Sequence, residues 1–109
     1  MSTDTKRQLD LSGYDRLLEH RSRFVICALL ANEADINFRE LKQLLKESDG
    51  NLGAQLRKLD VAGYIKVKRS FQHRRPVSSY SLTRKGNAAL SRHVSTIHRL
   101  TEDFHHETQ

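Results

Sequence analysis

The chain has 109 residues, of which 37% are hydrophobic and 29% are charged, a balance that suits one soluble domain with a single modest core. Its apolar run FVICALLA at 24–31 is shorter than the roughly 18 residues of a membrane span, and its first ten residues lack the apolar segment of a signal peptide. The single cysteine, Cys27, cannot form an internal disulfide. We therefore predict a cytoplasmic protein without a membrane partner, and an inert, buried Cys27 thiol.

The net charge of +6 is concentrated in the middle of the chain. Residues 1–38 hold five Lys or Arg and six Asp or Glu, residues 39–92 hold thirteen and four, and residues 93–109 hold one and three. A basic charge gathered in this way is typical of a nucleic-acid-binding surface. Taken alone, it is also compatible with a solvated basic surface that has no partner.

Two helices are predicted in the first part of the chain. Residues 14–33, YDRLLEHRSRFVICALLANE, form a helix that is continuous or divided around His20–Ser22. Because this helix is apolar on more than one side, we expect it to be central. Asn37, with Glu40 three residues later, forms a capping-box pair that starts a second helix at 39–46.

A third helix follows the turn at 48–51. Ser48 or Asp49 would cap its start, and the leucines between 52 and 59 recur at helical spacing as one apolar stripe. Gly63 stands just after the last periodic residue, as is typical of a helix end. Two short helices joined by a tight turn predict a helix-turn-helix, with a recognition helix at about 49–62.

The sequence period then changes from helical to alternating. Residues 64–69 predict a strand, and residues 77–82 predict its partner. The length of the connection and Pro76, which cannot donate to a strand ladder, favour a wide hairpin over a two-residue turn. Thr83 caps a last helix from 84 to about 103. A basic hairpin directly after a helix-turn-helix is expected to form a wing.

Two segments carry a resemblance to a known family: LKQLLKESDGNLGAQLRKLDVAGYIKVKRSF at 41–71 and RRPVSSYSLTRKGNAAL at 74–90. They resemble the winged-helix DNA-binding domains of small prokaryotic transcription regulators, and are similar to the MarR and ArsR groups. The resemblance covers about residues 20–92. It implies an α+β, mainly helical fold, a winged helix-turn-helix with a β-hairpin wing and a long C-terminal helix, and a role as a repressor. Gly53 departs from the Ser or Thr usual in that group, which removes a hydroxyl that could contact phosphate.

The third helix carries the candidate base-reading residues. With its leucines inward, we expect Asn51, Ala54, Gln55, Arg57 and Lys58 to point outward or sideways. Asn and Gln can bond adenine and Arg can bond guanine in the major groove, whereas Lys suits phosphate. We therefore predict base contacts by Asn51, Gln55 and Arg57 and a phosphate contact by Lys58. An ordinary solvated helix face is the alternative.

The wing, at about 69–79, supplies a second set of DNA-binding candidates. Arg74 and Arg75 are long enough to enter a minor groove, where arginine senses narrow, A·T-rich segments. His73 would add charge when protonated. Residues on the hairpin and at the start of the second helix are predicted to contact phosphates: Lys68, Arg69, Ser78 and Arg39. For the stem of the hairpin, a solvated strand face is the alternative.

The terminal helices have more apolar surface than a compact winged helix needs, which predicts a homodimer. The interface candidates are Leu17, Phe24, Ile97, Leu100 and Phe104. A symmetric dimer would place two recognition helices one duplex turn apart, roughly 34 Å, on a pseudo-palindromic operator in double-stranded DNA. The alternative is that the last helix closes the core of its own monomer. His93 is expected at the surface or in this interface.

The chain is expected to be one domain at 12–104, with flexible tails at 1–11 and 105–109. His98, Glu102 and His105 or His106 lie near helical spacing, but they have no Cys partner and form no HExxH pattern. No nucleophile, base and acid are placed together, and no glycine-rich phosphate loop is present. We therefore predict no enzyme activity, no cofactor and no metal.

The sequence favours a dimeric, sequence-specific DNA-binding regulator. Three alternatives stay open at this point: a winged-helix module that binds proteins, an RNA-binding winged helix, and an architectural DNA binder with little sequence preference.

Overall fold

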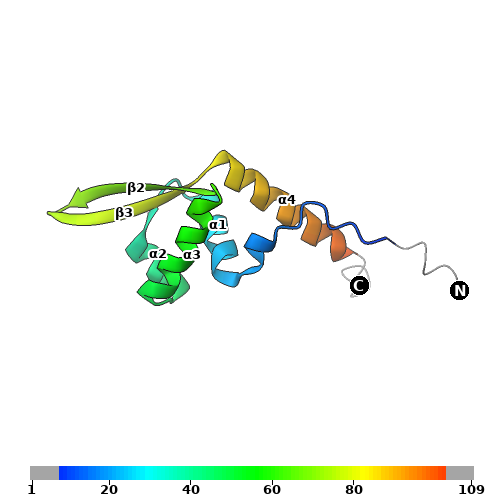
Figure 1. Cartoon of the computed structure of the whole chain (residues 1–109), viewed down its shortest axis with the longest axis horizontal. Coiled ribbons are helices and arrows are strands. Elements are labelled where there is room, and N and C mark those ends of the chain that lie inside the picture. Colours follow the sequence, from blue (N-terminus) through cyan, green and yellow to red (C-terminus); the bar gives the residue numbers. More distant parts are fainter. Residues whose placement is uncertain (1–7, 103–109) are drawn as a thin grey trace, which may run out of the picture.

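The computed structural model describes residues 8–102. In chain order its elements are η2 (Arg16–Glu19), α1 (Arg21–Asn32), β1 (Ile36–Asn37), α2 (Phe38–Leu45), α3 (Asp49–Val61), β2 (Ile65–Gln72), β3 (Arg75–Leu82) and α4 (Arg84–Leu100). Figure 1 shows α1, α2 and α3 gathered together, with the β2–β3 hairpin projecting to one side and α4 leading away on the other. The predicted winged helix-turn-helix is thus confirmed. Within the described residues, no helix is both long enough and apolar enough to cross a membrane.

The predicted helix starts are confirmed by their caps. His20 divides the first helical segment, because its Nδ1 accepts a hydrogen bond from the backbone N–H two residues later at 3.1 Å and so starts α1. Asn37 and Glu40 form the capping box of α2, with reciprocal hydrogen bonds of 2.8 and 3.1 Å. Ser48 caps α3 by accepting from the backbone of Asn51 at 3.2 Å. These caps satisfy donors that the helix itself leaves unpaired.

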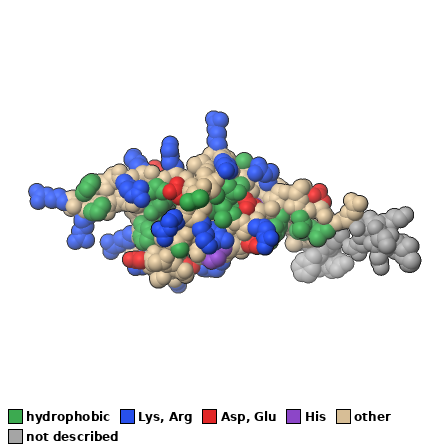
Figure 2. Space-filling view, viewed as in Figure 1, with side chains coloured by type: hydrophobic (Ala, Val, Ile, Leu, Met, Phe, Trp, Pro, Cys, Tyr) green, Lys and Arg blue, Asp and Glu red, His purple; other side chains and the backbone are tan. Residues whose placement is uncertain are grey.

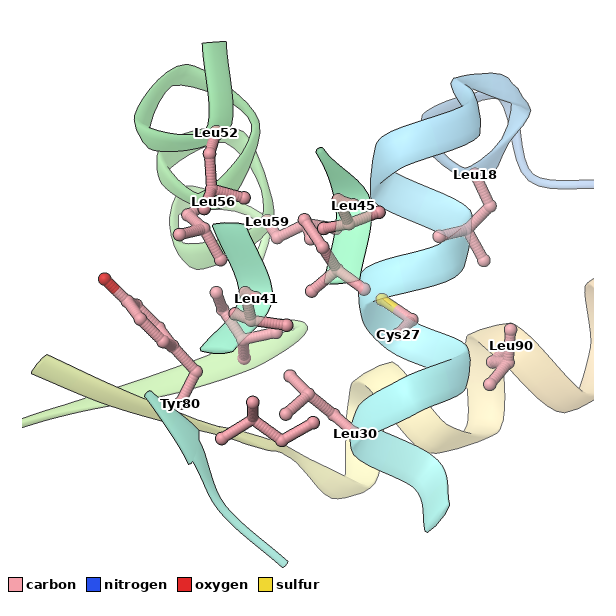
Figure 3. Close-up of a cluster of buried hydrophobic side chains, with 13 residues drawn as sticks. Leu18, Cys27, Leu30, Leu41, Leu45, Leu52, Leu56, Leu59, Tyr80 and Leu90 are labelled. Carbon is pink, nitrogen blue, oxygen red and sulfur yellow. The ribbon is translucent and has the colours of Figure 1, made fainter. Parts of the chain in front are cut away.

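The leucines of α2 and α3 hold the helix-turn-helix against α1. Figure 3 shows them converging on Cys27 and Leu30, with Tyr80 of the sheet below. Burial raises the pKa of the Cys27 thiol to about 12, so the unreactive, buried thiol predicted from the sequence is confirmed. The core residues are each at most 8% exposed: Leu18, Ile26, Cys27, Leu30, Ile36, Leu41, Leu45, Leu52, Leu56, Leu59, Ile65, Tyr80 and Leu90.

The sheet has three antiparallel strands in the order β1-β3-β2. The prediction of a wide hairpin is wrong, because the strands pair up to Gln72 and Arg75 and leave a two-residue turn. The turn residues, His73 and Arg74, have φ values of 50° and 67°. Positive φ at both positions is the mark of a type I′ turn, whose twist matches that of the strands. Neither residue is glycine or asparagine, so the turn is strained.

Pro76 fits within β3 because the ladder does not need its missing N–H. In a two-residue hairpin the pair beside the turn, here Gln72 and Arg75, is the hydrogen-bonded one. Antiparallel pairs alternate, so Phe71 and Pro76 form a non-hydrogen-bonded pair whose nitrogens face away from each other. The outer edge of β3 is also free there, since β1 pairs only with Ser79 and Tyr80.

One junction joins the end of α3, both wing strands and the start of α4. Gly63 ends α3 with a φ of 80°. Thr83 donates from its backbone to the carbonyl of Tyr64 at 3.0 Å and from its hydroxyl to the carbonyl of Gly63 at 2.6 Å. Gly86, in the first turn of α4, lies so close that a Cβ would be 2.2 Å from the Tyr64 carbonyl oxygen and 2.9 Å from Leu82. The close packing therefore requires a glycine at this position.

We expect Gly86→Ala to lower the free energy of unfolding by about 1–3 kcal/mol, because a backbone oxygen stands where the methyl would be. Gly53→Ala is the matched control. A Cβ on Gly53 meets nothing within 4 Å, so the change should instead stabilise α3 by about 0.5–1 kcal/mol. Denaturant unfolding of both variants measures the difference, and equal stabilities would contradict the close approach.

Candidate nucleic-acid interface

The outer face of α3 combines small and basic side chains. Arg57 and Lys58 are exposed, and Ala54 is half-buried between them and the core. Together with Val61 and Leu17 of η2, they line a shallow groove along the helix. Arg57 and Lys58 thus point outward as predicted, beside the apolar side chains of Leu17 and Val61.

The start of α3 is held by a cluster around Glu47. The Asn51 amide donates to one oxygen of this carboxylate at 2.9 Å, and the Ser22 hydroxyl donates to the other at 2.5 Å. The hydrogen bonds from Ser22 and Asn51, with Arg21 nearby, hold the pKa of Glu47 below its usual value. Asn51 is exposed as predicted, but contact with a base would require its amide to leave Glu47.

The carboxylate of Asp49 is the other acidic group at the start of α3. It is paired with Lys42 of α2 at 2.7 Å. Because both acidic groups at this end have hydrogen-bonding or cationic partners, they present less negative charge to an anionic ligand than the sequence suggests.

Gln55 does not point outward, and that prediction is wrong. Its side chain is buried, at 7% exposure, and its Oε1 accepts a hydrogen bond of 2.6 Å from the guanidinium of Arg23. Arg23 also donates through Nε to the carbonyl of Leu17 at 2.6 Å, so it ties η2 to α3. The spacing could have revealed this, since position 55 is three residues after one inward leucine and four before another. Gln55 is therefore removed from the base-reading set.

A second groove lies between the start of α2 and the wing. It brings together four residues predicted to contact DNA, although they come from two separate parts of the chain: Arg39, His73, Arg75 and Ser78. Asn37 and Phe38 line it on the side of α2, and Gln72, Pro76 and Val77 line it on the side of the hairpin. The groove is basic, and the N-terminal turn of a helix borders it. A nucleic-acid backbone is the ligand that such a surface suits.

The stem of the wing divides its basic residues between two faces. Arg69 pairs across the hairpin with Ser78, on the face that farther back covers the core. Lys68 is the neighbour of Arg69 in the strand, so it pairs with Ser79 on the opposite face of the hairpin. Arg74 lies in the turn at the free end. Figure 2 shows the resulting spread of Lys and Arg side chains around the hairpin. Lys68 and Arg69 therefore face different sides.

The dimer candidates separate into two places. Phe24 of α1 and Ile97 of α4 border one groove with Tyr14 and Leu18, whereas Leu17 lies in the groove beside α3. Ile97 and Leu100 are 38% and 42% exposed. Phe104 lies outside the described residues. The structure therefore brings Phe24 and Ile97 together and leaves Leu17 on another face.

His93 is at the base of the Phe24–Ile97 groove, not at the surface. It is 2% exposed, and its Nδ1 accepts a hydrogen bond of 2.9 Å from the backbone N–H of Asp15. Asp15 in turn accepts a hydrogen bond from the Tyr64 hydroxyl, at the end of α3. Burial, followed by this hydrogen bond, raises the pKa of Tyr64 to about 12. A polar link that the sequence did not predict thus joins α4 to the end of α3.

No group of three His, Cys, Asp or Glu side chains that could hold a metal occurs within residues 8–102. His98 is exposed on α4, and His105 and His106 lie outside the described range.

Comparison with known proteins places this geometry in a family. The sequence family described as "Winged helix DNA-binding domain" matches residues 22–101. An uncharacterized protein of Methanocaldococcus jannaschii is 32% identical over 82 residues, which cover 75% of this chain and 89% of that protein.

Two solved structures share the fold. A transcriptional regulator homologue of Pyrococcus horikoshii superposes with a TM-score of 0.77 at 21% identity, over 83% of this chain and 89% of its own. Apo MarR of E. coli superposes with a TM-score of 0.61 at 24% identity, over 82% and 75% respectively.

We expect Gln55→Ala to lower the free energy of unfolding by about 1–3 kcal/mol, because it leaves a guanidinium N–H of Arg23 without its partner in a partly buried place. The exposed Gln43 of α2 provides the control, and Gln43→Ala should change stability by less than about 0.5 kcal/mol. Denaturant titration of both variants measures this. If the two changed stability equally, the Arg23–Gln55 contact would contribute nothing to the fold.

Proposed function

The chain belongs to the winged helix DNA-binding domain family, and on this premise we propose that it is a homodimeric transcriptional regulator which recognises a specific sequence in double-stranded DNA. Its family is one of DNA-binding domains, so the chain is not an enzyme. The observation that carries the proposal is the basic groove in which Arg39 of α2 meets His73 and Arg75 of the wing. Arg57 and Lys58 of α3 are exposed at a groove of their own.

In this proposal α3 lies in the major groove. The small side chain of Ala54 lies in a shallow groove on its outer face, beside Arg57 and Lys58, and this groove would face the base edges. Arg57 is exposed and long enough to bond guanine, and Ala54 offers a methyl group to thymine. Asn51 would bond adenine after its amide leaves Glu47. Lys58, on the flank of α3, would contact phosphate.

The wing would contact the minor groove beside the α3 site. Arg74, at the free end, is placed to enter the groove, with Arg75 and His73 next to it. Arg39 and Ser78 border the basic groove between α2 and the wing, which would receive the phosphate backbone. Arg69 shares its face of the stem with Ser78 and would contact phosphates on that side, whereas Lys68 would contact phosphates from the opposite face.

The proposed dimer forms through α4 and the groove beside α1. Val94, Ile97 and Leu100 are between 38% and 45% exposed on α4, which is unusually apolar for an open helix face. Another side of α4 is covered by the chain itself, because Thr96 donates to the carbonyl of Ser12 at 2.7 Å. A second copy would therefore cover the face of Ile97, and two α3 helices would read a pseudo-palindromic operator. Occupation of that operator would block transcription.

We expect Arg57→Ala and Lys58→Ala to affect DNA binding in different ways. Loss of Arg57 should relax the preference at one base pair, with a cost of about 1–3 kcal/mol on the preferred site. Loss of Lys58 should weaken all sequences equally and reduce the slope of log K against log salt by about 2 for the dimer, because each protomer loses one phosphate contact.

Selection from random duplexes, followed by salt titrations, measures both effects for wild type and variants. Wild-type binding that is insensitive to salt, or stronger for structured RNA than for duplex, would contradict the proposed function. Equal losses without a change of preference would contradict only the separate roles of Arg57 and Lys58.

The dimer is tested by Ile97→Glu, which places a charge on the apolar face of α4 and should shift the protein to monomers in sedimentation experiments. Ser95→Glu is the control, since Ser95 is exposed on the opposite side of the same helix. It should leave the dimer unchanged. A monomeric wild type, or dissociation by both variants, would contradict an interface at Ile97.

A further inference from the structure

An apolar pair stands near the free end of the basic wing. Phe71 is 74% exposed, and it lies directly across the hairpin from Pro76, which is also exposed. The two form a non-hydrogen-bonded pair, the arrangement that brings cross-strand side chains closest together. Together they form an apolar surface near the tip of the wing that the described part of the chain does not cover.

The face of the hairpin that carries this pair points toward the helices. Ile65 and Tyr80 are buried on this face. Because every second residue of a strand lies on the same face, Arg69 and Phe71 share this face with Ile65 and lie farther toward the tip. α2 and α3 contact the strands on this side of the sheet, and Pro76 lines the basic groove between α2 and the wing. Figure 1 shows the hairpin reaching well beyond both helices.

The surroundings of the pair are strongly basic. Residues 61–101 contain no Asp or Glu, and Arg69, Arg74 and Arg75 lie within a few positions of the pair. Figure 2 shows apolar side chains near the free end of the hairpin, with Lys and Arg side chains around them. The positive charge therefore favours a polyanion as the ligand of the wing tip. The exposed Phe71 side chain favours a polyanion that also offers apolar surface.

The two-residue turn ends the wing in a short tip, from which single side chains can reach into a minor groove about 6 Å wide. The walls of that groove are deoxyribose rings between phosphates, and apolar Phe and Pro side chains are known to wedge between base steps from that side. Strand pairing up to Gln72 and Arg75 imposes the positive φ values of His73 and Arg74 and so defines the tip. The apolar Phe71–Pro76 pair and the basic residues around it thus both suit the minor groove of duplex DNA.

We propose that Phe71, backed by Pro76, is an apolar wedge that enters the minor groove beside the arginines and partly unstacks an adjacent base step. This inference rests on the proposed function, because it assigns a further contact within the same DNA complex. Phe71 then contributes affinity by burial of apolar surface, while Arg74 and Arg75 contribute by neutralising phosphates.

The two contributions differ in their dependence on salt. Phe71→Ala should weaken binding to the selected operator about tenfold with no change in the slope of log K against log salt, because the wedge releases no counterions. Phe71→Leu should retain most of the affinity. The double variant Arg74→Ala with Arg75→Ala should lose affinity, chiefly on A·T-flanked sites, with the slope for the dimer reduced by about 4, because both protomers lose two arginines.

Leu44→Ala is the matched control, since Leu44 is 58% exposed on α2 and lies in none of the grooves described above. It should bind like wild type. A 2-aminopurine placed in the segment beneath the wing should brighten when wild type binds and stay dim with Phe71→Ala. Unfolding measurements should show that Phe71→Ala is as stable as wild type.

The wedge is overturned if Phe71→Ala binds the operator as tightly as wild type, if its salt slope falls, or if wild type leaves 2-aminopurine dim. It is also overturned if the change impairs binding to anionic phospholipid vesicles and not to DNA. Failure of wild type to bind any duplex would instead contradict the proposed function itself.

Discussion

The close approach of α4 to the end of α3 is the constraint on which the functional geometry depends. Gly86 lies against the carbonyl of Tyr64, and Thr83 hydrogen-bonds to the same corner of the chain. Because β2 begins and β3 ends at this corner, it fixes where the hairpin leaves the domain relative to α3. The distance between α3 and the wing is thus set by packing at one glycine rather than by a long loop.

Two polar links extend this constraint to the rest of the molecule. Arg23 bridges the carbonyl of Leu17 and the amide of Gln55, which fixes the rotation of α3 about its axis. Asp15 contacts both Tyr64 and His93, so the end of α3 is also connected to α4. Removal of one partner from such a partly buried contact leaves the other unsatisfied, and this makes the arrangement of the helices specific. In the proposed dimer through α4, the contacts of Arg23 and Asp15 would also set the separation of the two α3 helices.

The proposed DNA surface combines three kinds of contact, and each comes from a different part of the fold. The outer face of α3 is small and basic, the groove beside α2 is basic and borders a helix start, and the wing carries an apolar pair among arginines. Phosphate contacts position such a protein, whereas base contacts and the shape of the groove give it specificity. The acidic groups at the start of α3 do not oppose this surface, because Lys42 pairs with Asp49, and Asn51 and Ser22 bond Glu47.

The sequence by itself determined the order of the elements, the caps at Asn37 and Ser48, the outward face of Arg57 and the basic character of the wing, because each depends on residues a few positions apart. It did not predict that Gln55 and His93 are buried, since their partners, Arg23 and Asp15, lie far away in the chain. It also placed Pro76 in a wide loop, since only the strand register shows that its missing N–H faces away from β2. The tertiary structure alone decided which candidates share a surface. Arg39 meets the wing, and Leu17 is separated from Ile97, because contacts between distant segments depend on how whole elements pack.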